Sequence, residues 1–221
     1  YANARGYVKN GHDVSVTTSA SVLQLKTIDG FTDGVMTYGE VSDSTANLLA
    51  DKGFYVSGSH AVTVTDAASV QDLKTIDGYT LGTFVYGTVT DKASVLAANV
   101  DGYVAGAHPA TVTDVAKMAE LFAIDGFTSG ALTYGAISDT AANLVTNVNG
   151  YLKNGHNVTV TDTASLDQLG KIDDFTDGTM TYGAISDTAQ LLYANARGYV
   201  KNGHDVSVTT AASVLQLKTI D

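Results

Sequence analysis

One spacing constrains this chain more than any other feature: a histidine returns every 48 residues. The five histidines are His12, His60, His108, His156 and His204, and most of their neighbours return at the same interval. The chain therefore holds four periods and 29 further residues. Repeats of this length bury their apolar faces by stacking on one another. A residue that returns in every period is expected to serve the scaffold, whereas an enzyme site needs residues that occur once.

Each period divides into two units, and each unit is expected to form a strand and then a helix. The A unit follows each histidine, and its second copy covers residues 60–79. There Val62 and Val64 alternate with threonines, which predicts a strand with one buried face. The B unit lies between successive A units. Its first strand is expected over residues 36–43, and Gly39 within it predicts a bulge or a close backbone approach.

Apolar residues at helical spacing follow each expected strand and predict amphipathic helices of about ten residues. Such stripes are Val70, Leu73 and Ile76, then Met118, Leu121 and Ile124 in A units, and Ala93, Leu96 and Val100, then Ala141, Leu144 and Val148 in B units. Helices this short are marginal alone, so packing must hold them.

Aspartate stands where the N-cap of each helix is expected, because its carboxylate can accept hydrogen bonds from the first-turn amides. These residues are Asp43, Asp66, Asp91, Asp114, Asp139, Asp162 and Asp187, with Thr18 and Thr210 in the two outer A units. Glycine is expected to end most helices. Aromatic residues then follow and are expected to plug the turns: Phe31, Tyr79, Phe127 and Phe175 in A units, and Tyr55, Tyr103, Tyr151 and Tyr199 in B units.

Strands and helices in alternation predict an α/β fold, a right-handed solenoid of βα units that average 24 residues, with a parallel sheet and a helical layer. One continuous array is expected over residues 1–221. The two strand types can share one sheet or form separate sheets. Residues 1–29 and 193–221 differ only at Ser19 and Ala211. We therefore expect an excerpt of a longer array, whose uncapped ends stack on like ends.

Composition excludes several classes of partner. The net charge of −11 repels phosphate backbones and anionic membranes, so neither nucleic acid nor a membrane surface is an expected partner. No apolar run reaches the length of a membrane span. Absence of cysteine excludes disulfides and thiolate chemistry. No residues form a nucleophile elbow, a phosphate-binding glycine loop or a unique Ser/His/Asp set, so no catalytic residue is assigned and no enzyme is expected.

Metal sites have little support in the pattern. Successive histidines are two βα units apart and cannot share one zinc ion, so we interpret them as turn residues before the A strand. Calcium is a weaker alternative to ordinary turn chemistry at the acidic, glycine-rich turns that contain Asp29, Asp33, Asp173 and Asp177. No cofactor is expected otherwise.

Serine and threonine form a column on the expected polar strand face: Thr17, Ser42, Thr65, Thr90, Thr113, Ser138, Thr161, Ser186 and Thr209. A second column, Ser15, Thr63, Thr111, Thr159 and Ser207, occupies A units alone because B units place Glu40, Ala136 and Ala184 there. A solvated face is the simplest interpretation. A binding surface for carbohydrate or protein, or for ice, is the alternative.

The segments Ile137–Leu144 and Val160–Leu166 resemble tandem repeats of very large secreted bacterial surface proteins. Those repeats carry Val/Ile-Ser/Thr-Asp-Thr-Ala-x-x-Leu and often accompany calcium-dependent secretion modules. The resemblance extends over the whole array. It implies a secreted or cell-surface structural role, such as an adhesin stalk, a surface-layer component or a filament that associates with itself end to end, and it supplies no catalytic residues.

Overall fold

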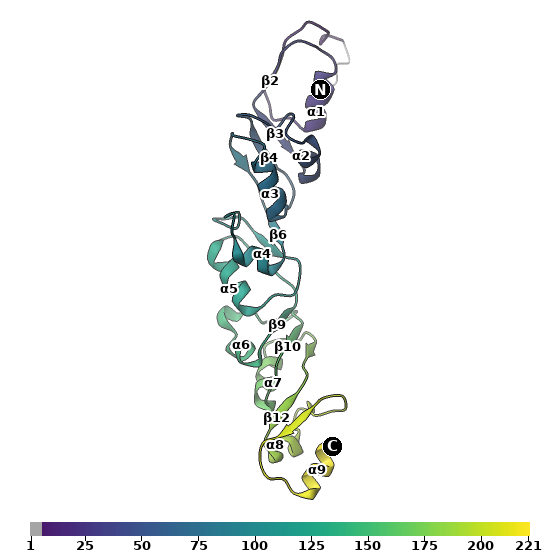
Figure 1. The fold of residues 1–221 in the computed structure, drawn as a ribbon, viewed down its shortest axis with the longest axis vertical. Coiled ribbons are helices and arrows are strands. Elements are labelled where there is room, and N and C mark those ends of the chain that lie inside the picture. The colour runs from purple at the N-terminus through teal and green to yellow at the C-terminus, as the bar shows by residue number, and fades with distance from the viewer. Residues whose placement is uncertain (1–5) are drawn as a thin grey trace. The chain divides into compact units, whose positions relative to one another are not determined.

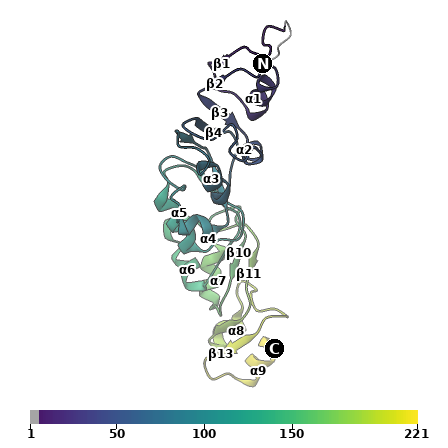
Figure 2. The same cartoon turned by 45° about the horizontal axis from the view of Figure 1, so that its top comes forward.

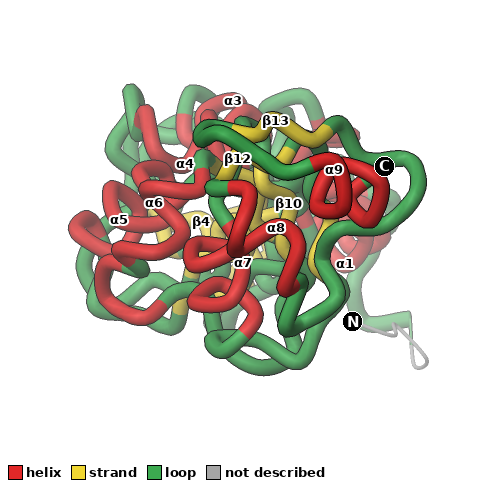
Figure 3. Tube along the Cα trace, turned by 90° about the horizontal axis from the view of Figure 1, so that it is seen from below, coloured by secondary structure: helices red, strands yellow, loops and turns green. Residues whose placement is uncertain are grey.

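A computed structural model describes residues 6–221, in which short parallel strands alternate with short helices (Figure 1; Figure 3). The strands are β1 (Val14–Val16), β2 (Met36–Tyr38), β3 (Glu40–Asp43), β4 (Ala61–Val64), β5 (Phe84–Val85), β6 (Val89–Asp91), β7 (Ala110–Val112), β8 (Leu132–Thr133), β9 (Ile137–Asp139), β10 (Val158–Val160), β11 (Met180–Thr181), β12 (Ile185–Asp187) and β13 (Val206–Val208). The expected order of strand and helix is confirmed.

The helices have six to ten residues each. They are α1 (Val22–Asp29), α2 (Thr45–Asp51), α3 (Val70–Asp77), α4 (Ala93–Ala98), α5 (Met118–Phe127), α6 (Ala141–Thr146), α7 (Leu166–Asp173), α8 (Ala189–Ala194) and α9 (Val214–Ile220), and one 3-10 turn covers Val148–Gly150. Helices α1, α3, α5, α7 and α9 belong to A units, and the others belong to B units.

The strands form five small sheets rather than one long sheet. Their orders are β1-β2, β3-β4-β5, β6-β7-β8, β9-β10-β11 and β12-β13, with parallel pairing. The sequence left open whether A and B strands share one sheet. They share each of these small sheets, and the pairing changes where each B strand breaks at the glycine after its tyrosine. At Gly39, β2 ends its pairing with β1 and β3 begins pairing with β4. No atom lies within 4 Å of a Cβ built at Gly39, so the break is a bend and not a close approach.

Contacts group the chain into two bodies. Body 1 contains residues 1–91, 99–111 and 127–132, and body 2 contains residues 92–98, 112–126 and 133–221. In body 1, helices α1 and α2 lie on the same side of strands β1 to β4 in both views (Figures 1 and 2). In body 2, α6 packs against α7, and both lie on the same side of β10 and β11 in Figure 2.

One leucine from each helix except α9 enters the core. In body 1, Leu25, Leu48 and Leu73 are fully buried, as are the inward strand residues Val41 and Val62. Each such side chain contributes roughly 1.5–3 kcal/mol by leaving water. Body 2 repeats the pattern with Leu121, Leu144, Leu169 and Leu192. The predicted stripes are therefore confirmed at these positions.

Helices α4, α6 and α8 end earlier than predicted, at an asparagine instead of a glycine, and α2 ends at Lys52. Asn147 has φ +42°, a left-handed conformation that stops α6. Its side-chain amide donates to the carbonyl of Leu152 and accepts from the amide of Leu152. Asn99 and Asn195 make the same pair of bonds in their copies. Val100 and Val148, predicted to be core residues, consequently lie beyond the helices and are 86% and 41% exposed.

Candidate functional site

The aspartate at the end of each strand caps a helix of the preceding unit. In B units, Asp43 and Asp139 also accept the amide of the residue that caps their own helix. Seven such carboxylates accept the first amide of the helix 21 residues earlier, at 2.7 to 3.2 Å. The pairs are Val22 with Asp43, Thr45 with Asp66, Val70 with Asp91, Ala93 with Asp114, Met118 with Asp139, Ala141 with Asp162 and Leu166 with Asp187. Thr210 does the same for Ala189. Each cap therefore joins two successive units.

In seven of the described helices the N-cap position itself is taken by serine or threonine, which corrects the assignment of the aspartates. Lysine precedes the other two, α4 and α5. Ser44 caps α2 and Thr140 caps α6, each directly after the aspartate. In A units the N-cap comes three residues after the aspartate, as with Ser69 after Asp66. The Thr45 hydroxyl also donates to Asp66 at 2.7 Å. Burial raises the pKa of Asp66, but the bonds from Thr45 outweigh this and bring it below the usual value.

Every histidine from the second copy onward stacks on the tyrosine that precedes it in the B unit. The ring centroids lie 4.1 to 4.6 Å apart and the planes differ by 12° to 17°; the pairs are Tyr38 with His60, Tyr86 with His108, Tyr134 with His156 and Tyr182 with His204. The Nδ1 atom of His156 lies 2.7 Å from the carbonyl oxygen of Gly135. The histidines are thus ring partners between units, consistent with the interpretation as turn residues.

A second tyrosine in each B unit completes a hydrogen-bonded chain. The Tyr38 hydroxyl donates to the carbonyl of Tyr55, and the Tyr55 hydroxyl donates to the Asp29 carboxylate at 3.1 Å. Tyr55 is 7% exposed. Burial first, and then the bond to Asp29, raise its pKa to about 12. The same chain recurs through Tyr86, Tyr103 and Asp77, through Tyr134, Tyr151 and Asp125, and through Tyr182, Tyr199 and Asp173.

These contacts confirm that the B-unit aromatic residues are buried plugs, whereas the A-unit aromatic residues are not. Phe127 is 41% exposed, and the threonine that follows it, Thr128, is 7% exposed. The Thr128 hydroxyl donates to the carbonyl of His108. A Cβ at Gly130 would overlap the same His108 carbonyl group, so this close approach requires glycine. Sequence reasoning missed both residues, although each recurs at the 48-residue period.

The four aspartates considered for calcium serve two different structural roles. Asp29 and Asp173 accept tyrosine hydroxyls from Tyr55 and Tyr199. Asp33 and Asp177 each accept a glycine amide at 2.6 Å, from Gly11 and Gly155. Within residues 6–221, no three His, Asp or Glu side chains lie close enough together to hold a metal ion.

The outward strand faces carry rows of hydroxyl side chains across neighbouring strands. Ser138, Thr159 and Thr181 form one row of three in β9, β10 and β11. Other rows are Ser15 with Thr37, Ser42 with Thr63, and Ser186 with Ser207. The prediction that the second column stays within A units is wrong, because the break at the B-unit glycine brings Thr37 and Thr181 beside Ser15 and Thr159. Val85 interrupts the row next to Thr63.

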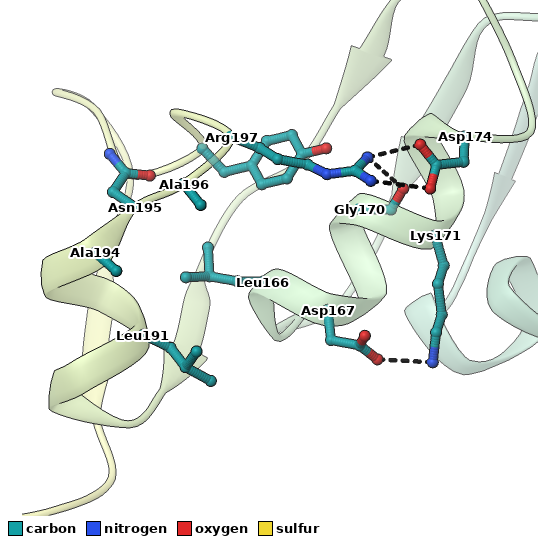
Figure 4. Close-up of a pocket in the computed structure, with 11 residues that line it drawn as sticks. Leu166, Asp167, Gly170, Lys171, Asp174, Leu191, Ala194, Asn195, Ala196 and Arg197 are labelled. Carbon is teal, nitrogen blue, oxygen red and sulfur yellow. Dashed lines mark hydrogen bonds and ion pairs between the residues drawn. The ribbon is translucent and has the colours of Figure 1, made fainter.

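A surface groove of about 480 Å³ between α7 and α8 contains Asp167, Lys171 and Asp174, which no other period repeats, together with Arg197 (Figure 4). The Arg197 guanidinium donates to both Asp174 oxygens, at 2.7 and 3.1 Å, and to the carbonyl of Gly170. Its hydrogen bonds lower the pKa of Asp174. Lys171 pairs with Asp167 at 2.8 Å. Because each charge is matched by its neighbour, the groove presents no free acid, base or nucleophile.

Comparisons with known proteins add no relative. No protein-family model, curated protein or solved structure matches the chain. In the described part of the chain, no helix is both long and apolar enough to cross a lipid bilayer.

Proposed function

We propose that this chain is a structural repeat scaffold, an α/β solenoid of βα units, within a secreted or cell-surface bacterial protein. An adhesin stalk, a surface-layer component or a filament that associates end to end would use such an array. One observation carries the proposal: the recurring aspartate, tyrosine and histidine side chains make contacts between successive units. Asp162 accepts a hydrogen bond from the Ala141 amide, and the Tyr151 hydroxyl donates to Asp125. The His156 ring stacks on Tyr134.

The constant sequence offsets of these contacts support a translational array. The aspartate caps span 21 residues, the tyrosine-to-carbonyl bonds span 17, and the tyrosine-to-aspartate bonds span 26. Contacts at a fixed offset stabilise each repeat through its nearest neighbours, as in solenoids. The resemblance of the Ile137–Leu144 segment to repeats of surface proteins supplies the proposed location.

Deletion of one period tests the scaffold. Removal of residues 93–140 joins Lys92 to Ala141, which occupies the same position as Ala93. We expect a folded chain with unchanged helix content per residue and a smaller denaturant m value, because m scales with the surface exposed on unfolding. The control deletion of residues 93–128 leaves the units out of phase and should abolish cooperative unfolding. Loss of folding in the in-phase deletion would contradict the repeat scaffold.

Surface location has its own test. Antibodies against residues 1–221 should label intact cells that produce the protein. Labelling that requires cell lysis would contradict a cell-surface role, and the protein would then be sought in the culture medium. Absence from both the surface and the medium would exclude the proposed location.

The hydroxyl rows favour a second candidate, a binding module for carbohydrate or protein. Thr159 and Thr181 are neighbours in register and both are exposed. A panel of glycans and surface proteins should yield a ligand whose binding is lost in Thr159→Lys and retained in Thr146→Lys, a substitution on α6. Ice is the third candidate ligand, and thermal hysteresis that disappears in Thr159→Lys would favour it. Equal binding by both variants would exclude this face.

A further inference from the structure

The turn before each A strand occurs in two versions. Both versions end on the histidine that marks the period. One version reads Lys-Asn-Gly-His, at residues 9–12, 153–156 and 201–204. The other reads Ser-Gly-Ser-His at residues 57–60 and Ala-Gly-Ala-His at residues 105–108. The Asn-Gly pair therefore belongs to one version of the turn and is not required by the repeat.

In the first and fourth copies, the Asn-Gly pair is accompanied by an aspartate 21 positions after the histidine. These aspartates are Asp33 and Asp177. Their carboxylates accept the backbone N–H of Gly11 and of Gly155, each at 2.6 Å. The glycine nitrogen of each pair is therefore held directly by a carboxylate.

The other version of the turn closes without that carboxylate. Leu81 and Ser129 stand at the position of the aspartate. Their backbone amides donate to the carbonyl oxygens of Gly58 and Gly106, each at 2.6 Å, so the contact across the turn runs in the opposite direction. Because the fold does not need an aspartate here, its presence beside the Asn-Gly pairs calls for a chemical reason.

An exposed Asn-Gly pair can modify itself without an enzyme. The glycine nitrogen loses its proton and bonds to the side-chain carbonyl carbon of asparagine, the bond from that carbon to the side-chain nitrogen breaks, and ammonia leaves with the proton. Water then opens the resulting succinimide at either carbonyl, which gives aspartate or isoaspartate. Glycine has no side chain to hinder the attack. Asn154 and Gly155 are both exposed, so water reaches the pair.

The carboxylate of Asp177 opposes the first step of this reaction. The attacking nitrogen must lose its proton, and the Gly155 N–H donates that proton to Asp177 in a short hydrogen bond. Hydrogen bonds to an ionised acceptor are stronger than those to a neutral one. The negative charge also disfavours a second negative charge on the nitrogen beside it. This bond must therefore break before the ring can close.

We propose that Asn154 is a self-modification site, which converts to aspartate or isoaspartate through attack by the Gly155 nitrogen, and that Asp177 restrains the conversion. Asn10 and Asp33 belong to a second site of the same kind. The only co-reactant is water. The copies of the turn that lack asparagine have nothing to restrain, and they have leucine or serine in place of the aspartate.

Conversion alters a turn that contacts the preceding B unit. Asn154 lies between Lys153 and His156, and both of those side chains lie over the Tyr134 ring. The lysine nitrogen is 5.8 Å from the ring centroid, and the histidine ring stacks at 4.6 Å. Isoaspartate lengthens the main chain between the two residues by one methylene group. We therefore expect the isoaspartate form to unfold at a lower urea concentration than the unmodified chain.

Another Asn-Gly pair in the same body gives an internal comparison. The Gly150 amide donates to the carbonyl of Asn147 at 3.0 Å, and the Asn149 side chain donates to the Tyr151 hydroxyl at 3.1 Å. Both acceptors are neutral groups close in the chain, and both residues of the pair are exposed. A substitution at Asp177 should therefore leave the conversion of Asn149 unchanged.

Asp177→Leu tests the restraint with the residue that the second copy has at the equivalent position, Leu81. Both chains are incubated at mildly alkaline pH in water labelled with oxygen-18 and then cleaved with trypsin after Lys153, which separates the two asparagines. Mass spectrometry should show conversion at residue 154 about tenfold or more faster in the variant, with one labelled oxygen in the product. That factor corresponds to the loss of one hydrogen bond to a charged group.

Two further variants make the result specific. Asp33→Leu should accelerate conversion at residue 10 and leave residue 154 at its native rate. Asn154→Gln, combined with Asp177→Leu, should yield no rapid product at residue 154, because the longer side chain cannot close the same ring. Circular dichroism of each variant checks that the helices are retained.

Equal rates at residue 154 in the native chain and in Asp177→Leu would overturn the proposal, whether both rates are fast or slow. Equal acceleration at residues 149 and 154 would also overturn it, because the restraint would then belong to the fold as a whole and not to one carboxylate. Acceleration at residue 154 alone, matched by acceleration at residue 10 alone in Asp33→Leu, is the result that supports it.

Discussion

At the scale of single residues, a carboxylate at the end of one strand fixes the first amide of a helix 21 residues earlier. Asp162 accepts from Ala141 at 2.7 Å in body 2. Loss of a capping side chain costs about 1 kcal/mol, within a range of about 0.5–2. We therefore expect Asp162→Ala to lower the free energy of unfolding by about 1 kcal/mol in urea titrations.

The matched control for that substitution is Asp167→Ala on α7. Asp167 pairs only with Lys171 four residues later, and its side chain is 69% exposed. Exposed pairs of this kind contribute about 0.3–0.5 kcal/mol, so the midpoint should scarcely move. Equal losses in the two variants would show that the aspartate column does not join neighbouring units.

The aspartate column also shows how far residue types predict contacts. A carboxylate before an apolar stripe is typical of a helix start, and a helix start is what each aspartate binds. The sequence could not reveal which helix, because Ser44 and Thr140 next to the aspartates are equally good caps. The choice depends on the stacking of units, which no local pattern encodes. The tyrosine and histidine columns were recognisable by period, but their stacking partners were not.

At the scale of elements, an asparagine ends helices α4, α6 and α8. Asn147 tolerates the left-handed conformation and brackets both backbone groups of Leu152. Asn147→Ala loses both bonds and adds strain, which together cost about 2 kcal/mol. Asn147→Gly relieves the strain and loses the bonds, at a cost of about 1 kcal/mol. In thermal or urea unfolding, the native chain should be the most stable, Asn147→Gly less stable and Asn147→Ala the least stable.

Aspartate offers a further comparison, because Asp51 is the sequence equivalent of Asn147 in the first period, where the next residue, Lys52, has the left-handed conformation. Asp51 accepts from the amides of Tyr55 and Val56 without donating to a carbonyl. Asn147→Asp should therefore be milder than Asn147→Ala. If Asn147→Ala were as stable as the native chain, the hydrogen bonds between Asn147 and Leu152 would not be the cause of helix termination.

Element boundaries were less predictable than element order. Alternation and apolar spacing gave each strand and helix, since Val62, Val64 and Leu73 are buried as their patterns require. The break at Gly39 divides one expected strand into β2 and β3, because each half pairs with a different A strand. That division depends on how the strands of successive units align, which the sequence of a single period does not show. Because of this division, the hydroxyl rows contain residues of both A and B units, whereas one of the predicted columns was confined to A units.

At the scale of the whole chain, buried tyrosine hydroxyls connect stability to alkaline pH. Burial is the first cause that raises the pKa of Tyr38, Tyr55, Tyr86, Tyr103, Tyr134, Tyr151 and Tyr199. A group whose pKa is raised by folding stabilises the protein fully below its unfolded value, and the stabilisation disappears as pH rises through the folded value. For Tyr55 this window runs from the unfolded value of 10.0 to about 12.

Because these tyrosines recur through the array, we expect them to ionise together with unfolding instead of one by one. Absorbance of tyrosinate should rise steeply over the pH interval in which the circular dichroism of the helices is lost. Tyr55→Phe removes one titrating hydroxyl along with its bond to Asp29. That variant should be less stable near neutral pH, and its stability should fall less between pH 10 and about 12. Tyr193→Phe, at a side chain 38% exposed on α8, is the comparison. A gradual rise in tyrosinate absorbance with the helices intact would show that solvent reaches the Tyr–Tyr–Asp chains without separating the units.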